Sequence, residues 1–343
     1  MKLKESLSSV TKDLIGLLLL IVFLILFFNI DYFKDQEAFN SIPQAWLNVN
    51  TIFLSIVIEA IPFILLGVFF SSLIQIYVSE ETIQRYLPRN ALSALVPAAV
   101  LGAIFPICEC AIVPVVRRLI KKGMPLHIGV VFLVAAPILN PIVAASTYFA
   151  FRNDLSVLYS RMGLAFVLAI LIGAILYLIF KNSDQLKWST EELIGKQKGA
   201  TSQVPVRQMN RFKQMFYHAS DEFFLMGKYL IAGAFIASLF QTFLDRNLLA
   251  AIGSNEWSST AVMMAFAFLL SLCSEADAFV ASSFGSTFTT GSIIAFLVYG
   301  PMLDLKNTVM LFAFFKAKFV ITFMITVTVV VFVAIMGLQF FIL

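Results

Sequence analysis

The chain has 343 residues, of which 60% are hydrophobic and only 13% are charged. A soluble domain usually carries about 25% charged residues, so this composition cannot cover a water-exposed surface and excludes an ordinary soluble protein. The net charge of +4 is small, and the positive residues fall in short segments between apolar runs. That distribution indicates a protein oriented in a lipid bilayer rather than one that binds nucleic acid.

The N-terminal segment, 1–50, begins with Lys2, Lys4 and Lys12 around the start of an apolar run at 14–28. A signal peptide has a similar pattern, but here no cleavage site of small residues follows the run. We therefore expect an uncleaved first membrane span at 14–30, followed by an external loop.

The rest of the chain contains several apolar runs long enough to cross a membrane, which takes about 20 residues of helix. The candidate spans lie at about 14–30, 52–78, 126–150, 160–180, 214–243, 291–314 and 319–341. Two further runs, 91–120 and 258–288, are too long for one span and are interrupted. The first contains Pro97, Pro106 and Pro114, and the second contains Ser271, Ser274, Glu275 and Asp277. We expect each of these two runs to form a hairpin of helices that returns to its starting side.

The distribution of Lys and Arg predicts the orientation of these spans, because basic loops stay in the cytoplasm. The basic residues before 14 place the N-terminus there. With two hairpins, all strongly basic loops fall on the same side. The segment 181–213 is basic and is the only long polar stretch, so it is predicted to be a cytoplasmic linker between two transmembrane halves, 51–180 and 214–343.

The two halves resemble each other when the sequence is shifted by 166 positions. The matched pairs are Gly67 with Gly233, Phe69 with Phe235, Ser72 with Ser238, Leu73 with Leu239, Gln75 with Gln241 and Glu109 with Glu275. With a two-residue gap, 137–140 also matches 301–304. Since 52–78 and 214–243 are predicted to run in opposite directions, the halves form an inverted repeat. The fold class is then an all-α polytopic membrane protein whose broken helices meet near the membrane midplane, as in secondary transporters. A duplication without a transport site is the alternative.

Both interrupted runs place carboxylates deep among apolar residues. Glu109 lies in the first, and Ser274, Glu275 and Asp277 lie in the second. A charge at the bilayer centre costs on the order of 2.5–3.5 kcal/mol, so such residues usually face a cavity, a partner or an ion. These residues are therefore candidates for binding a solute or ion, and the glutamates for carrying protons. The alternative is a protonated Glu that hydrogen-bonds a neighbouring helix.

All three cysteines lie beside these glutamates, at Cys108, Cys110 and Cys273. An odd number of cysteines within apolar runs argues against a disulfide framework. Thiolates bind soft metals and metalloids, so the three side chains are candidate ligands for a transiently bound metal. Cysteine also serves simply as a small apolar residue in helices, and that alternative stays open.

Asn140 and Asp304 occupy equivalent positions in the middle of two spans, and each follows a proline by three residues. We expect the helix to unwind there and free backbone carbonyls to bind a ligand, although a simple proline kink would give the same pattern. Lys306 is close enough in sequence to pair with Asp304. Glu59 and Glu222 are two further acids in predicted spans.

No phosphate-binding loop, zinc-protease motif or nucleophile elbow is present in the sequence. The sequence therefore predicts neither an enzyme nor a resident cofactor. An intramembrane enzyme that uses Cys and Glu is disfavoured because no His lies near the thiols.

Two blocks of residues resemble a known family. These are Pro106-Ile107-Cys108-Glu109-Cys110 with Gly123-Met124-Pro125 and Ala136-Pro137-Ile138-Leu139-Asn140-Pro141, and Leu272-Cys273-Ser274-Glu275-Ala276-Asp277-Ala278-Phe279 in the second half. They resemble the YraQ-type predicted permeases, relatives of the ArsP organoarsenical permeases, over roughly 50–310. The resemblance implies a multi-pass permease of the bacterial inner (cytoplasmic) membrane. Some family members are paired with a second membrane-anchored protein, so it also implies such a partner.

The sequence thus predicts a secondary transporter that moves a small solute or ion, with efflux of a soft metal or metalloid and proton coupling as the finer hypothesis. A membrane scaffold or subunit that acts with a partner protein is one alternative. A passive channel is another.

Overall fold

The computed structural model describes residues 44–77, 93–104, 108–181, 183, 185–187, 211–243, 256–285 and 287–341. The chain divides into two units, residues 1–50 and 51–343. The predicted span at 14–30 and most of the predicted linker at 181–213 lie outside the described residues.

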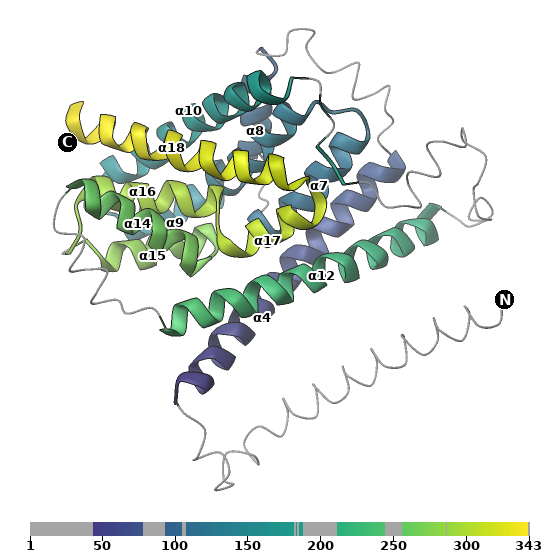
Figure 1. Ribbon diagram of the computed structural model, residues 1–343, viewed down its shortest axis with the longest axis horizontal. Coiled ribbons are helices and arrows are strands. Elements are labelled where there is room, and N and C mark those ends of the chain that lie inside the picture. The colour runs from purple at the N-terminus through teal and green to yellow at the C-terminus, as the bar shows by residue number, and fades with distance from the viewer. Residues whose placement is uncertain are drawn as a thin grey trace, which may run out of the picture. The chain divides into compact units, whose positions relative to one another are not determined.

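The regular elements of the described residues are helices, apart from an isolated β-bridge between Leu186 and Phe315 (Figure 1). The earlier ones are α4 (Gln44–Tyr77), α6 (Leu95–Ile104), α7 (Glu109–Lys121), α8 (Leu126–Leu139), α9 (Pro141–Ala150) and α10 (Leu155–Phe180). The later ones are α12 (Arg211–Phe243), α14 (Glu256–Leu270), α15 (Ser274–Ser283), α16 (Thr290–Met302), α17 (Leu305–Phe314) and α18 (Ala317–Phe341). The predicted all-α class is confirmed.

Six stretches of the described chain are helical, long and apolar enough to cross a membrane. They are Gln44–Ile74, Leu126–Ala150, Leu155–Phe180, Glu222–Phe243, Thr290–Phe314 and Ala317–Phe340. They coincide with six of the predicted spans, and the protein is a multi-pass membrane protein. The third begins earlier than predicted because Asp154 caps α10, where its carboxylate accepts a hydrogen bond from the Ser156 backbone N–H at 3.1 Å. Such a cap satisfies one of the free N–H groups at a helix start.

The two interrupted runs do contain shorter helices, but two of the three prolines do not cause the interruption. Pro97 lies in the first turn of α6, where backbone N–H groups have no partner inside the helix and proline is tolerated. Pro114 lies inside α7, which continues through it, as helices in membranes often do. The expectation that Pro97 and Pro114 break the run was therefore wrong. Pro106 falls outside the described residues. The second run is interrupted at 271–273, as the polar residues there predicted.

Helices of the first half pack in pairs that recur in the second half. Helices α6 and α10 both pack on α8, and α14 and α18 both pack on α16. Helix α7 packs against α17, and α15 packs against α9. Helix α8 also contacts α16, and α10 contacts α18, at the interface between the two halves. The short helices that follow each break thus pack on the opposite half.

Two glycines allow especially close helix approaches. A Cβ on Gly67 of α4 would lie 2.6 Å from the Ala111 backbone oxygen in α7. A Cβ on Gly233 of α12 would lie 3.0 Å from the Lys306 Cα in α17. The long helices α4 and α12 therefore contact α7 and α17, the short helices that carry charged residues, at close range.

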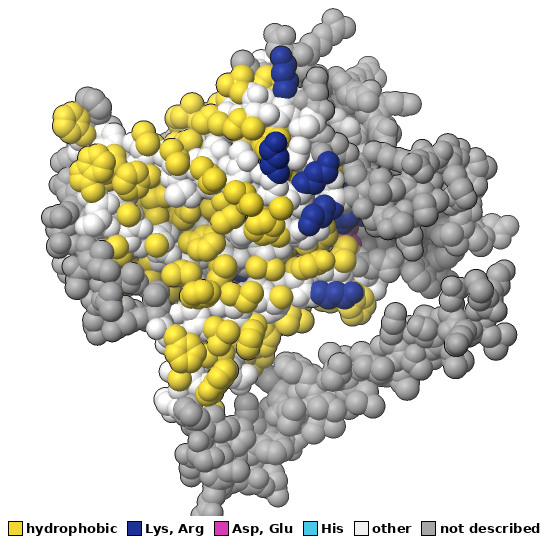
Figure 2. Space-filling model, in the orientation of Figure 1, with side chains coloured by type: hydrophobic (Ala, Val, Ile, Leu, Met, Phe, Trp, Pro, Cys, Tyr) yellow, Lys and Arg dark blue, Asp and Glu magenta, His cyan; other side chains and the backbone are white. Residues whose placement is uncertain are grey.

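Apolar side chains cover most of the described surface in Figure 2, as a lipid-facing protein requires. Lys and Arg side chains on this face gather toward one end. The core is built from the middle helices: residues 128–136 of α8 and 291–302 of α16 are all buried.

Candidate functional site

Two spans are interrupted at equivalent points. Helix α8 ends at Leu139, and Asn140 then caps α9 by accepting a hydrogen bond from the Val143 N–H at 2.9 Å. Helix α16 ends at Met302, and Asp304 caps α17 by accepting one from the Asn307 N–H at 2.6 Å. The predicted unwinding at Asn140 and Asp304 is confirmed. Side-chain caps satisfy the backbone at these breaks without water, which the middle of a membrane requires.

Lys306, in the first turn of α17, has its ammonium group enclosed by three oxygen atoms. Its Nζ donates to Glu109 Oε1 at 3.2 Å and to the Ser271 carbonyl at 2.9 Å, and it lies 3.6 Å from Asp304 Oδ2. We call these three oxygens the lysine cage. Lys306 is 2% exposed and Glu109 is 1% exposed, so this ion pair is removed from solvent. The predicted pairing of Lys306 with Asp304 is confirmed, and Glu109 is a second, closer partner.

The interruption before α15, at residues 271–273, supplies the third oxygen of the cage, the Ser271 carbonyl, through an unusual backbone conformation. Ser271 has a φ of 47°, in the left-handed region that non-glycine residues rarely adopt. Its hydroxyl accepts a hydrogen bond from the Leu305 N–H at 3.1 Å, while its carbonyl faces Lys306. The Gln241 side chain donates to the Leu270 carbonyl at 2.5 Å. Ser271 is thus bonded to α17 and its neighbour Leu270 to α12, and the left-handed backbone at Ser271 directs its carbonyl at a cation.

Ser274 and Arg161 connect this break to the first half. The Ser274 hydroxyl donates to Glu109 Oε2 at 3.4 Å. Arg161 of α10 is 0% exposed and donates to the Ser274 carbonyl at 3.0 Å and to Thr147 Oγ1 of α9 at 2.6 Å. Sequence reasoning missed Arg161, although a lone Arg inside an apolar span is itself a signal for a functional site.

Asp277 lies in the first turn of α15 and is buried. It interacts electrostatically with Arg161, Glu109, Lys306 and Asp304. These five residues, Glu109, Arg161, Asp277, Asp304 and Lys306, are called the charge cluster below. Glu275, two residues earlier, is only partly buried and is not one of the cage residues.

The three cysteines are buried near the charge cluster. Cys108 and Cys273 precede α7 and α15 with extended backbones, and Cys110 and Cys273 interact electrostatically with Lys306. All three are free thiols. Among the residues that the structure describes, no group of three His, Cys, Asp or Glu side chains is arranged to hold a metal ion. The metal-ligand role of Cys108, Cys110 and Cys273 stays a prediction.

A second polar contact lies elsewhere on α7. Glu222 of α12 accepts hydrogen bonds from Arg118 Nη2 at 3.2 Å and from the Ser71 hydroxyl of α4 at 2.7 Å. Glu222 is buried and joins three helices, whereas Glu59 is exposed. Of these two predicted intramembrane acids, Glu222 is buried, and Glu59, although exposed, interacts electrostatically with Cys273 and Glu275.

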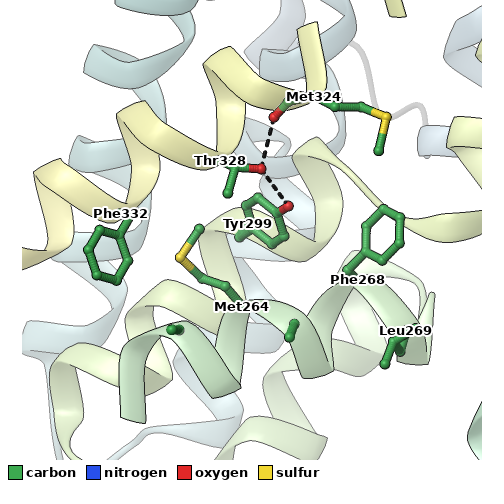
Figure 3. A pocket seen from close by; sticks show the side chains of 9 residues that line it. Met264, Phe268, Leu269, Tyr299, Met324, Thr328 and Phe332 are labelled. Atoms are coloured by element: carbon green, nitrogen blue, oxygen red, sulfur yellow. Dashed lines mark hydrogen bonds between the residues drawn. The ribbon is translucent and has the colours of Figure 1, made fainter. Parts of the chain in front are cut away.

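Residues of α14, α16 and α18 line an open pocket of about 410 Å³ (Figure 3). Its lining includes Met264, Phe268, Met324 and Phe332, with no charged side chain. Its Tyr299 hydroxyl bonds to Thr328 at 2.8 Å, and Thr328 in turn donates to the Met324 carbonyl. Because this pocket is lined mainly by apolar side chains and its two hydroxyls are already hydrogen-bonded, the charge cluster is the better candidate site for a polar solute or ion.

The structure brings most predicted site residues together. Glu109, Asp304 and Ser274 meet around Lys306, with the buried Cys110, Cys273 and Asp277 nearby. Asn140 serves as a helix cap in the first half, and Glu275 is partly exposed. Sequence reasoning missed Arg161 and the Ser271 carbonyl, and it did not anticipate that Lys306 would reach Glu109.

Membrane-crossing helices with matched interruptions, and buried charges joining the two halves at those interruptions, define a polytopic membrane protein built around an internal polar site. The chain belongs to the predicted permease family ArsP_1, whose family model matches residues 45–340.

Two relatives show the same family. One is the "UPF0718 protein YcgR" of Bacillus subtilis (strain 168), which is 50% identical over 84% of this chain and 96% of that protein. The other is the "Putative two-component membrane permease complex subunit" of Streptococcus mutans serotype c, which is 38% identical over 86% of this chain and 96% of that protein. No solved structure matches the chain significantly.

Proposed function

We propose that the protein is a secondary permease that moves a small solute or ion through the charge cluster, between two halves arranged as an inverted repeat. The observation that carries this proposal is the buried Lys306–Glu109 ion pair, which joins a helix break of one half to a helix break of the other. Asp304 is the fifteenth residue of the 25-residue span Thr290–Phe314, so the pair lies near mid-depth. Ionisable groups at that depth are expensive and normally serve a transported species.

The matched packing of the halves supports the repeat. Besides the paired helix contacts, Ser72 donates to the Phe69 carbonyl and Ser238 donates to the Phe235 carbonyl, both at 2.8 Å. These serines and phenylalanines are matched by the 166-residue shift. In transporters with inverted repeats, the two halves rock about a site at their interface, and a cluster held from both halves suits that motion.

The cysteines carry the finer hypothesis about the cargo. Cys110 and Cys273 interact electrostatically with Lys306, so a soft metal or metalloid species that reached the cluster would have thiols close by. We propose efflux as the direction and protons as the coupling ion, with Glu109 and Glu275 as carriers. The gathering of basic side chains at one end in Figure 2 supports a cytoplasmic location for that end, and we propose the same side for the N-terminus.

The experiment is a sensitivity survey of cells lacking the protein against salts of metals and metalloids. The deletion strain is expected to be more sensitive to at least one of them, and the wild-type gene restores resistance. The Glu109→Gln variant, present in the membrane at wild-type level, should fail to restore it. Cys→Ser replacement of all three cysteines decides whether the cargo is soft: full resistance in that variant would overturn the thiol hypothesis but not the permease.

A second candidate function is that of a subunit acting through a partner protein. The name of the Streptococcus mutans relative refers to a two-component membrane permease complex. Replacing 188–210 of the linker with a neutral sequence separates the two candidates. A subunit that recruits its partner through the linker should lose function, whereas a self-sufficient permease should keep most of it.

A further inference from the structure

The charge cluster contains more negative than positive groups. Its carboxylates are Glu109, Asp277 and Asp304, and its cations are Arg161 and Lys306. With every group ionised, one negative charge remains in excess. Glu275, which is partly buried and interacts electrostatically with Glu109 and Arg161, adds to this excess. An uncompensated charge away from water is costly, so the cluster favours the entry of one more positive charge.

The geometry of the cage suits a cation. Two carboxylate oxygens and a backbone carbonyl surround a single point, and Lys306 Nζ occupies that point. These are the ligand types that bound metal cations take from proteins. The oxygens come from three separate segments: α7, the break before α15 and the break before α17. The three oxygens therefore form a cation site, and the ammonium group of Lys306 occupies it.

The interactions that bind the Lys306 ammonium group are weaker than the number of nearby oxygens suggests. Asp304 Oδ2 lies 3.6 Å from Nζ, which is within ion-pair distance but too long for a hydrogen bond. Asp304 Oδ2 and Asp277 Oδ2 are both buried acceptors without a hydrogen-bond partner among the described residues. A lysine ammonium sits on a flexible four-carbon stem, so it can leave such a cage more easily than a bidentate arginine could.

We propose that the species passing through this site is a cation, and that Lys306 is a built-in competitor that leaves the lysine cage when the cation enters. This inference rests on the proposed function, because it names the class of substrate for the same site. With one monovalent cation bound, the five charges of the cluster would be balanced. The lysine then keeps the site occupied between transport events, so that the bare carboxylates are never left facing one another.

A competitor that occupies the site lowers the apparent affinity for the substrate, because the substrate can bind only during the fraction of time that the site is free. Removing the ammonium should therefore strengthen cation binding. The Lys306→Met change keeps an unbranched side chain of similar reach and removes the charge. Lys228→Met is the matched control, since Lys228 is an exposed lysine on α12.

The test uses purified full-length protein in lipid nanodiscs. Chlorides of Na⁺, Zn²⁺ and Cd²⁺ are titrated singly, with choline chloride as the control for ionic strength. The rise in unfolding temperature with cation concentration is fitted to single-site linkage, which gives an apparent Kd. For at least one cation, Lys306→Met should bind about tenfold more tightly than wild type, while Lys228→Met should match wild type. Zn²⁺ and Cd²⁺ without Na⁺ would indicate that the thiols take part; Na⁺ alone would indicate the oxygens.

A second variant covers the case in which Lys306→Met does not fold. Glu109→Gln removes one cage carboxylate and the excess charge, so it should abolish the cation response seen with wild type. Equal apparent Kd values for wild type and Lys306→Met, or an undiminished response in Glu109→Gln, would overturn the inference. So would the lack of any cation response in all proteins. The proposed function would survive those results if the wild-type gene still restored resistance in the sensitivity survey, and it would fall if that resistance were unaffected by Glu109→Gln.

Discussion

The cysteines that directly precede α7 and α15 have nearly the same backbone conformation, but the glutamates that follow them have different surroundings. Each helix is preceded by a cysteine in extended conformation, with φ and ψ of −74° and 167° at Cys108 and −71° and 144° at Cys273. Each then places a glutamate in its first turn. Yet Glu109 is buried against Lys306, and Glu275 is partly exposed.

The difference arises from a residue on the opposite half. Helix α17 packs on α7 and supplies Lys306 to Glu109, whereas α9 packs on α15. When Asn140 is aligned with Asp304, the position of Lys306 corresponds to Ile142, which is exposed. The start of each helix thus places a glutamate at a similar point, and a residue of the facing helix decides whether that glutamate is paired. We expect the two breaks to respond differently to mutation.

The largest effect on stability is expected from Lys306→Met. Removing one partner of a buried ion pair leaves the other charge uncompensated, and the free energy of unfolding should fall by about 3–5 kcal/mol. Lys228→Met on the exposed face of α12 should change it by less than about 0.5 kcal/mol. Denaturant titration of both variants in mild detergent measures the difference. Equal stabilities would mean that the cage contributes nothing to the fold.

A smaller effect should separate the matched glycines. In Gly67→Ala the new methyl group meets the Ala111 backbone at 2.6 Å, which side-chain motion cannot relieve, so we expect a loss of about 1–3 kcal/mol. In Gly233→Ala the nearest atom is the Lys306 Cα at 3.0 Å, and the loss should be smaller. Gly163→Ala, with open space around the new methyl group, is the control. Thermal unfolding in detergent ranks the three variants, and a reversed order would contradict the close approach of α4 to α7.

The smallest effect is expected at the Asn140 cap. Asn140→Ala removes the hydrogen bond from the Val143 N–H and should cost about 1 kcal/mol, the usual value for losing an N-cap. Asp304→Ala removes an equivalent cap and also a cage carboxylate, so its effect on function should be far larger. Asn153→Ala, at an exposed position, controls for surface changes. Comparing unfolding midpoints with survival in the sensitivity survey separates the two roles. Equal loss of resistance in Asn140→Ala and Asp304→Ala would contradict the distinction.

Much of the architecture could be predicted from the sequence because it follows from local rules. Apolar runs of sufficient length predicted the spans, and the polar residues from Ser271 onward predicted the second interruption. The proline at 97 misled the prediction because its position in a helix turn, and not its presence, decides whether a helix ends. Asn140 and Asp304 were found because both the proline and the polar residue recur in each half.

The cage itself could not be predicted, because it depends on packing between distant segments. Glu109 and Lys306 are 197 positions apart, and neither residue carries a local mark of its partner. Ser271 takes part through its carbonyl, which any residue possesses, and its positive φ has no sequence signature in a serine. Arg161 could have been noticed as a lone charge within an apolar span, although its contacts with Thr147 and Ser274 could not.

The central claim is that the charge cluster around Lys306, and not the helix breaks in general, is the permeation site. It is tested most directly by reconstituting the protein into liposomes and measuring flux of the solute identified in the sensitivity survey. Glu109→Gln and Asn140→Ala, which alters a helix break outside the charge cluster, are compared at equal incorporation. If the charge cluster is the permeation site, flux falls to near the protein-free background in Glu109→Gln, and Asn140→Ala keeps most of the wild-type flux. Wild-type flux in Glu109→Gln would contradict that claim.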